Sequence, residues 1–540
     1  RIGVASDSSV TTQTSSVIAA STTNANLVIA PNGTGAIVAS IPDGTATGGN
    51  ARGVNSVDLQ RVRYASTQVA GSPNSVIVGG NNNTTTGATG FNVVVGGSDN
   101  TAGNNSYNSI LGGAGNFTNS SYCVVVGGQN NTTYSDRTFI GGGASNNNSS
   151  QYGVISGGQS NTASTNSHAT VIGGQSNTAS GLHSVAGGFG SVASGGVSFA
   201  YGTSSSASGT WAIAMGYSSS ASNTMSIAIG REALSWGQGA IAIGNTNPVA
   251  LATNTIAIGT SSRAETINAI AIGTSTQATA SRGIAIGYGS TSNSAANGIA
   301  IGDNVSANAQ YSIAIGRNNA GIDNAFIAIG NTISNVGGRT VAIGNNITNA
   351  SGYDAVNLGS GNTTSSNYST VSGGQSNTAS TNTHATVVGG QSNTSSGVGS
   401  ISGGSLNTAS GTNSIALGYQ NNASGNYSIA TGFQSASTKL GSVAIGIIAN
   451  ATADYSTAFG ARSNSYLYGQ LSVANDNFTG AGYSQAQQSL LTARREATLT
   501  TGATTTLSLD GTGTTNLIIP NGTNRMWKVK VEWVATVTTI

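Results

Sequence analysis

The stretch "SIAIG" occupies residues 226–230, and the same five letters return at 312–316. Close variants follow the same plan, among them "GIAIG" at 283–287 and "SIALG" at 414–418. Between Gly80 and Gly460 there are 27 motifs of this kind, and their closing glycines are 14 to 17 residues apart. The chain is therefore built from a short repeat that covers most of its length.

The length of the repeat indicates the fold class. Helical hairpins and propeller blades need about 30 residues or more, whereas 14 residues suit one turn of a parallel β-solenoid. Strand side chains alternate between two faces, so we expect Ile227 and Ile229 to fill the core together. Polar stretches such as "QSNTAS" at 159–164 supply the bends. We predict an all-β solenoid of about 27 turns over residues 75–460, with isoleucine and asparagine ladders.

The closing glycine has a structural explanation. A residue without Cβ adopts positive φ at a sharp corner without steric cost. A phosphate-binding loop is excluded as the reason for the glycines, because the sequence contains no G-x-x-x-x-G-K-[ST] motif.

An alanine stripe accompanies the isoleucines. Ala228 lies between Ile227 and Ile229, and the same position is alanine in Ala214, Ala242, Ala257, Ala271, Ala285, Ala300, Ala314, Ala328 and Ala342. We interpret this small-residue strand face as the surface through which copies of the chain associate. The alternative is that alanine merely suits a crowded, exposed ladder.

Composition excludes several classes of protein. The chain has 540 residues, 79 glycines, only 6% charged residues and a net charge of +2, so it has no basic stripe of the kind that binds nucleic acid. Its 37% hydrophobic content argues against disorder. We also expect no membrane insertion, because no stretch of about 18 apolar residues is present.

The sequence contains no recognisable catalytic or metal-binding pattern. His168, His183 and His384 are scattered, and His168 and His384 lie in a duplicated segment, which explains that pair better than metal binding does. Cys123 is the single cysteine and is expected to be a small buried residue. We therefore predict no enzyme activity, no catalytic, cofactor-binding or metal site, and no cofactor.

The run from "SFAYGTSSSASGTWAIAMG" at 198–216 through "GSVAIG" at 441–446 resembles the head repeats of YadA-like trimeric adhesins. The "GGQSNTASG" variants resemble a sister repeat of bacteriophage tail fibres. This resemblance, over about residues 75–460, implies a left-handed β-roll assembled as a homotrimer.

The flanking segments favour the phage family. Residues 27–60 and 485–534 resemble modules that precede and follow such repeats in phage fibres. We divide the chain into a β-rich connector or cap (1–74), the solenoid shaft (75–460), a transition (461–484) and the start of a C-terminal β domain (485–540), which we read as part of something longer.

Three functions compete. The first is the shaft of a virion tail fibre, with virion baseplate or tail proteins as partners and a host glycan or protein receptor bound mainly at the distal end. The second is the head of a bacterial surface adhesin, and the third, an ice-binding solenoid, is weakened by the absence of Thr-x-Thr ladders. Aromatic and charged residues that suit a distal tip follow the repeats: Tyr466, Tyr468, Phe478, Arg494, Arg495, Trp527 and Trp533.

Overall fold

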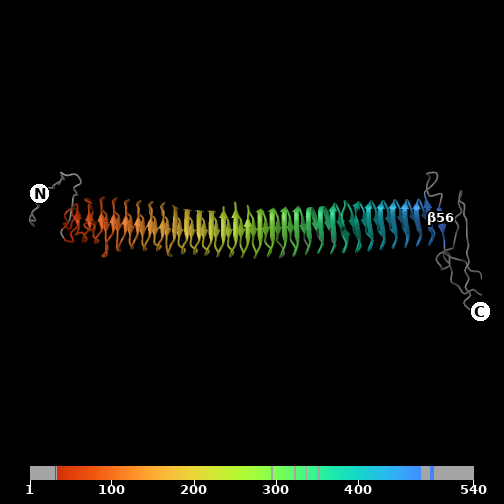
Figure 1. Ribbon diagram of the computed structural model, residues 1–540, viewed down its shortest axis with the longest axis horizontal. Coiled ribbons are helices and arrows are strands. Elements are labelled where there is room, and N and C mark those ends of the chain that lie inside the picture. Colours follow the sequence, from red (N-terminus) through yellow and green to blue (C-terminus); the bar gives the residue numbers. More distant parts are fainter. Residues whose placement is uncertain are drawn as a thin grey trace, which may run out of the picture. The chain divides into compact units, whose positions relative to one another are not determined.

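The computed structural model describes residues 31, 33–293, 296–321, 324–335, 337–349, 353–475 and 487–491. Every regular element in these ranges is a β-strand (Figure 1). Backbone contacts divide the chain into two units, residues 1–268 and 269–540. Each unit is a parallel β-solenoid, and together they contain about 28 turns. The predicted fold class is confirmed.

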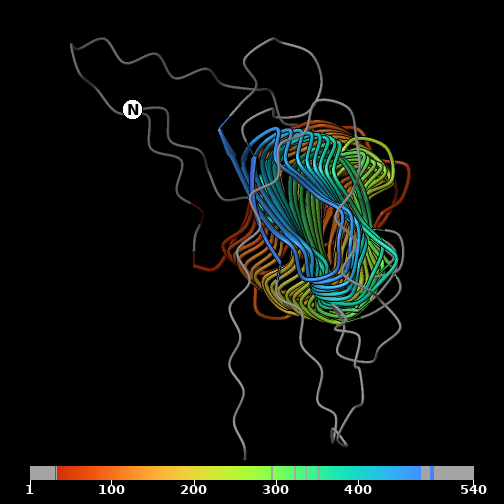
Figure 2. The same cartoon turned by 90° about the vertical axis from the view of Figure 1, so that its right-hand side faces the viewer.

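A single turn consists of two strands separated by corners. The first strand carries the repeated motif, as in β23 (Ile227–Gly230), and the second strand is short, as in β24 (Leu234–Ser235). First strands pair in parallel with the first strands of neighbouring turns, so Ile227 lies beside Ile241 of β25 (Ile241–Gly244). Figure 2 looks along the stacked turns and shows the single turns as flattened loops. Like residues therefore stack on like residues.

Strand length varies along the chain while the pairing persists. The first strands near the N-terminal end have two residues, and those of unit 2 mostly have five. Representative first strands are β1 (Ile37–Val38), β2 (Val57–Asp58), β3 (Val76–Ile77), β21 (Ile213–Tyr217), β31 (Ile284–Tyr288), β47 (Ile415–Tyr419), β49 (Ile429–Phe433) and β53 (Thr457–Ala461). Representative second strands are β4 (Thr84–Thr85), β16 (Thr178–Ala179), β20 (Ser206–Ala207), β46 (Thr408–Ala409) and β48 (Asn422–Ala423).

The core is lined by the alanines, and the prediction that Ile227 and Ile229 fill it was wrong. Ala228 is fully buried, whereas both isoleucines are half-buried on the outer face of the strand. The same holds for the whole predicted alanine stripe, whose ten members all have no exposed surface: Ala214, Ala228, Ala242, Ala257, Ala271, Ala285, Ala300, Ala314, Ala328 and Ala342. The small-residue face is therefore internal and is not available for association.

The reason lies in the narrowness of each turn. The second strand also points a small residue inward, so Ala409 and Ala423 of second strands join Ala416 and Ala430 of first strands in one cluster. Where alanines of both strands meet in this way, they leave no space for a branched side chain at either of those positions. Turns near the N-terminal end have inward isoleucine or valine instead: Ile77, Val94, Ile110, Val125, Ile140, Ile155 and Val171.

The closing glycine is required by both conformation and space. Gly230 has φ of +125°, and a Cβ atom there would lie 1.8 Å from the carbonyl oxygen of Gly244 on the next turn. The predicted structural role of the glycine is confirmed. The serine that opens the motif is also explained, because the buried Ser226 hydroxyl donates a 2.6 Å hydrogen bond to the carbonyl of Asn223 and so closes the preceding corner.

Asparagine ladders form where an asparagine stands three residues after the closing glycine. The Nδ2 atom of Asn421 donates to Asn407 Oδ1 at 2.9 Å, to the Leu417 carbonyl at 2.9 Å and to the Gly432 carbonyl at 2.8 Å. Among the described residues, thirteen asparagines in this column are essentially fully buried: Asn83, Asn100, Asn116, Asn131, Asn146, Asn161, Asn177, Asn319, Asn362, Asn377, Asn393, Asn407 and Asn421. Each of these side chains forms hydrogen bonds with the backbone of its own corner and with the neighbouring turns, so it links successive corners.

The ladder extends on both sides of residues 75–460. Strand β1 pairs in parallel with β2, and β2 pairs with β3. At the other end β53 pairs in parallel with β55 (Leu471–Asn475). Strand β56 (Gln487–Leu490) then pairs with β55 in the antiparallel direction and covers its outer edge. An antiparallel strand at this position ends the parallel stack.

Candidate interaction surfaces

The first strands present an apolar outer face. We call it the isoleucine face, and it consists of the residues on either side of the inward residue of each first strand, such as Ile227 and Ile229 beside Ala228. Several members are well exposed in the single chain, including Val78 at 47% and Ile343 at 41%. First strands of successive turns pair with like residues opposite each other, so these side chains form continuous ladders within each unit. A long apolar strip of this kind indicates a surface that a partner covers.

The second strands present a polar outer face. Their outward residues are mostly threonine, serine or asparagine, as in Thr178, Ser206 and Asn422. The two faces of the solenoid therefore differ in chemistry, and association is expected on the isoleucine face. The prediction of a homotrimer contact through the small-residue strand face was wrong, because that face is the core of each turn.

One corner of unit 1 carries a ladder of stacked rings. It lies just before the first strand of each turn, and we call it the ring ladder. Successive ring centroids are 5.1 Å apart from Phe91 to Tyr107 and 4.8 Å apart from Tyr107 to Tyr122. The Arg137 guanidinium lies 5.3 Å from the rings of both Tyr122 and Tyr152. The ladder continues through Tyr152, His168 and His183, with centroid distances of 4.8 and 4.6 Å.

The backbone conformation at this corner is energetically unfavourable for aromatic residues. All seven members of the ladder have positive φ between 55° and 65°. Asparagine adopts this conformation more easily than bulky residues do, and Asn254 and Asn413 occupy equivalent corners elsewhere. Stacking stabilises each aromatic pair by about 0.5–1.5 kcal/mol, which offsets part of this conformational cost. The rings nevertheless keep much of their surface in solvent, with Tyr107 and Tyr122 exposed by 47% and 48%.

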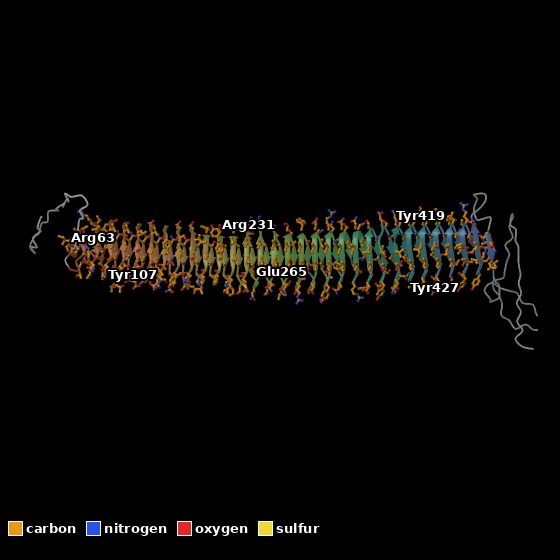
Figure 3. The ribbon with its side chains drawn as sticks, in the orientation of Figure 1. Arg63, Tyr107, Arg231, Glu265, Tyr419 and Tyr427 are labelled. Atoms are coloured by element: carbon orange, nitrogen blue, oxygen red, sulfur yellow. The ribbon has the colours of Figure 1, made fainter. Side chains whose placement is uncertain are left out.

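The opposite corner is different in character. Figure 3 shows Tyr107 and Arg231 on opposite edges of unit 1. The Arg231 guanidinium lies 6.0 Å from the centre of the Tyr217 ring and pairs with Glu232. Most other residues with positive φ at this corner are serine, asparagine or glycine, as in Ser204 and Asn130. The ring ladder therefore distinguishes one edge of the unit from the other.

The histidines are less scattered than the sequence suggested. His168 and His183 stack on each other, and His384 stacks on Tyr368 with a centroid distance of 5.0 Å. The signal was present in the sequence, because the members of the ring ladder are one turn apart. In the part of the chain that the structure describes, no three His, Cys, Asp or Glu side chains gather in a metal-binding arrangement.

The remaining singled-out residues have separate positions. Cys123 is buried, and its Sγ atom lies 3.2 Å from the Ser135 carbonyl oxygen. Tyr466 and Tyr468 are half-buried, and the Tyr468 ring meets that of Tyr455 edge-on at 5.5 Å. The other residues expected at a distal tip lie outside the described residues: Phe478, Arg494, Arg495, Trp527 and Trp533.

Seven segments of the chain match the family model described as YadA head domain repeat: residues 207–233, 221–247, 250–276, 267–290, 294–319, 409–435 and 437–463. The chain contains YadA head domain repeats. Together with the β-solenoid, they make it an adhesin-like fibrous structural protein of the kind that is exposed outside the cell. None of the curated proteins matches the chain. Within the described residues, no helix is long and apolar enough to cross a membrane.

Proposed function

We propose that the YadA head repeats form the homotrimeric shaft of a bacteriophage tail fibre, which spaces a distal receptor-binding tip from the virion. The observation that carries the structural role is the register of the turns, in which the same backbone position repeats from one turn to the next. Such a surface offers few irregular loops, and recognition usually depends on irregular loops held by a rigid scaffold. A spacer without enzyme activity fits this surface.

The isoleucine face supports trimer formation. Its side chains are half-buried in one chain, so packing three such faces together would remove the rest of their apolar surface from water. The polar outer face of the second strands would then face solvent. This arrangement replaces the alanine contact with an isoleucine contact and keeps the homotrimer that the resemblance implies.

The phage context depends on the flanking segments. Residues 27–60 and 485–534 resemble the modules that border such repeats in tail fibres, and we propose tail or baseplate proteins of the virion and a host-surface glycan or protein as partners. The proposed division of the chain remains 1–74, 75–460, 461–484 and 485–540, with the parallel ladder extending into the two neighbouring segments.

A bacterial adhesin head that touches the host directly is the second candidate. The ring ladder favours it, because exposed tyrosine and arginine side chains on a rigid support are typical of binding surfaces. In that case the shaft itself would bind the host, with many equivalent weak contacts acting together.

Three measurements test the proposal. Light scattering of the full chain should give about three times the chain mass of 52.9 kDa. Antibodies against the solenoid should label tail fibres of virions, and labelling confined to the surface of intact bacteria would support the adhesin instead. Replacing Tyr107 and Tyr122 with serine should leave host-cell binding unchanged if the shaft is a spacer, and a tenfold loss would favour direct binding by the ring ladder.

A further inference from the structure

A cavity of about 270 Å³ interrupts the isoleucine face of unit 1. We call it the glycine notch, and two exposed side chains and three glycines line it: Ile172, Tyr201, Gly173, Gly174 and Gly188. Strand β17 (Val185–Phe189) runs between the two side chains. Its Gly187 pairs with Tyr201 and contributes no side chain of its own to the face, which leaves the gap open.

The same turn carries an aromatic side chain without an apolar neighbour in its column. Phe189 is 51% exposed and pairs in register with Gln175 and Thr203, which are both polar. It lies two residues after Gly187, so it belongs to the same outer face as the glycine notch. Phe189 does not line the notch of its own chain. A hole and a projecting phenyl group therefore occur at one level of unit 1.

The corresponding place in unit 2 is built differently. Residues 373–397 repeat residues 157–181, so Val388 stands where unit 1 has Ile172, and Gly403 follows in the next turn as Gly187 does. A Cβ atom on Gly403 would lie 2.2 Å from Val388 Cγ2, whereas a Cβ atom on Gly187 would lie 3.5 Å from Ile172 Cβ. The valine therefore leans over its glycine. Two residues after Gly403 stands Ser405, so the projecting phenyl group is also missing there.

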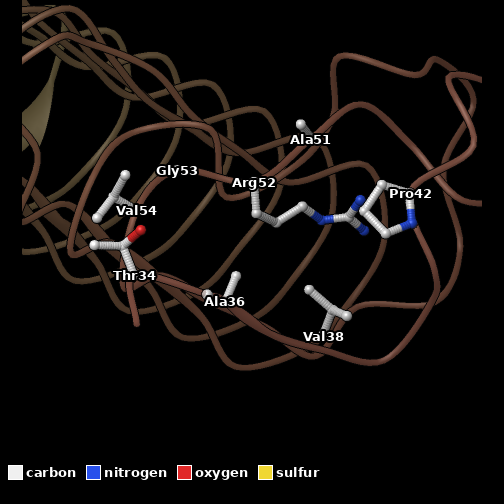
Figure 4. Close-up of a pocket in the computed structure, with 9 residues that line it drawn as sticks. Thr34, Ala36, Val38, Pro42, Ala51, Arg52, Gly53 and Val54 are labelled. Atoms are coloured by element: carbon white, nitrogen blue, oxygen red, sulfur yellow. The ribbon is translucent and has the colours of Figure 1, made fainter. Parts of the chain in front are cut away.

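A second cavity has another setting. It measures about 390 Å³, and its lining includes Val38, Pro42 and Arg52 of the N-terminal turns (Figure 4). Arg52 pairs with the buried Asp58 carboxylate at 2.8 Å, and Arg63 pairs with the same carboxylate at 3.2 Å. Buried ion pairs thus border this cavity, whereas apolar side chains of the isoleucine face border the glycine notch.

The isoleucine face of unit 1 exposes an area comparable with that of a stable interface. Eight of its large side chains are 37–48% exposed in the single chain: Val78, Val95, Leu111, Val126, Phe139, Ile172, Tyr201 and Met215. At on the order of 150–200 Å² for a whole side chain, these eight expose roughly 500–700 Å². Half-buried neighbours such as Ile227 add to this area, and a standard interface takes about 800 Å² from each partner. The face that surrounds the notch therefore suits a second copy of the chain.

We propose that the glycine notch receives Phe189 of a second copy of the chain and so fixes the height at which the copies stand beside one another. This contact rests on the homotrimer proposed above. Rotation about an axis parallel to the stacking direction preserves height, so Phe189 of one copy lies at the level of the notch in the next. Three such contacts close into a cycle, since each copy contributes one phenyl group and one notch.

The rest of the isoleucine face does not define this height. Its ladders present the same residue at successive turns, as in Ile227, Ile241 and Ile256. Two copies displaced by one turn would still bring apolar side chains together, so the register is weakly specified by the ladders alone. A phenyl group and a notch at a single level specify it, and aromatic side chains are common anchors of protein interfaces.

Photo-cross-linking of the full chain identifies what Phe189 contacts. p-Azidophenylalanine in place of Phe189 keeps the aromatic group and bonds covalently to its neighbours on illumination. We expect a product of two or three chains in which mass spectrometry joins position 189 to residues 172–174 or to Tyr201. The same analogue in place of Tyr217, an exposed residue of the same column, should not label the notch, because the outward position of that turn is filled by Met215.

The other outcomes are equally decisive. A bond between two 189 positions would place the phenyl groups on the symmetry axis, and either that bond, a bond within one chain or no bond would overturn the proposal. Light scattering of the unchanged chain separates this contact from the homotrimer itself. A trimer with one of those results refutes only the notch contact, whereas a monomer refutes both proposals.

Two substitutions test the contribution of the contact. Phe189→Ser removes the phenyl group, and Ile172→Trp fills the notch from a wall residue that is 48% exposed. Each should raise the concentration of half-dissociation about tenfold in a dilution series, with circular dichroism unchanged. The double variant should be no weaker than either single variant, because both changes remove one contact. Trp211→Ser, which changes an exposed aromatic residue of a corner, should have no effect. Additive effects of the two substitutions would overturn the proposal.

Discussion

The assignment of core and outer face can be tested within a single turn. Strand β38 (Val341–Asn349) contains Ala342, which is fully buried, and Ile343, which is 41% exposed, as neighbours. Exchanging either residue for glutamate introduces the same charge on opposite faces of one strand. Thr348→Glu is the matched control, because Thr348 is exposed on the second-strand side of the same turn.

The expected effects differ in kind. Ala342 packs in one cluster with Ile333 and Ile347, so Ala342→Glu would place an unpaired carboxylate in a dry core at a cost of several kcal/mol. This variant should lose structure locally whether or not it associates. Ile343→Glu should leave the isolated chain folded, because the side chain is already partly in water.

The cost of Ile343→Glu should appear in the assembly. Full burial of an isoleucine contributes about 1.5–3 kcal/mol, and the part still exposed in one chain is worth about 0.6–1.2 kcal/mol. Three chains together would lose roughly 2–4 kcal/mol, before the repulsion of three carboxylates is added. A loss of this size lowers the association constant by roughly 30- to 700-fold, so in a dilution series followed by light scattering Ile343→Glu should dissociate at higher concentrations than the unchanged chain, with circular dichroism unchanged. A folded Ala342→Glu variant together with an Ile343→Glu variant that associates as tightly as the unchanged chain would refute the reasoning.

Three further changes have defined outcomes. Gly230→Ala should lower the urea midpoint sharply, because its Cβ would clash with the carbonyl of the next turn, and an unchanged midpoint would contradict the corner geometry. Asn421→Leu should cost about 2–4 kcal/mol in urea unfolding, since buried acceptors lose their donor, whereas Asn421→Ser should cost less because serine occupies this column one turn later. Hydrogen bonds from the Ser120 hydroxyl and the Ser121 backbone hold the pKa of Asp136 below its usual value, so their stabilisation is present above the unfolded pKa of about 3.9 and is lost as the pH falls through the folded pKa. Asp136→Asn should reduce that acid dependence, and identical pH profiles would argue against this role.

The sequence was sufficient for the architecture because the period and the closing glycine each have a single physical explanation. It was insufficient for the direction of the side chains. Alternation places Ile227 and Ile229 on one face and Ala228 on the other, but it does not say which face is inside. The decision depends on the width of the turn, and this width follows from small residues that both strands point inward. Because isoleucine has a larger apolar side chain than alanine, size alone favoured the isoleucine face as the core, which is the wrong face.

The candidate surfaces were predictable to different degrees. The ring ladder could have been found by aligning the turns, because Tyr152, His168 and His183 occupy the same position of successive repeats. The buried ion pairs of Arg52 and Arg63 with Asp58 could not be predicted, since these residues lie in turns without the glycine motif and their hydrogen bonds depend on loop conformation. The buried asparagine column lies between these cases, because ladders were expected but their burial was not.

The alanine core also has a mechanical consequence. Backbone hydrogen bonds between turns run along the stacking direction, so a pulling force loads the turns of a unit in series and the weakest turn yields first. The buried alanines add little dispersion attraction to those hydrogen bonds. A turn should therefore detach abruptly once its hydrogen bonds have been stretched by a short distance. Each released 14-residue turn would lengthen the chain by about 41–46 Å, which is its extended length less the roughly 4.8 Å that it spans in the stack. Stretching a unit should therefore give small, evenly spaced steps instead of one large unfolding event.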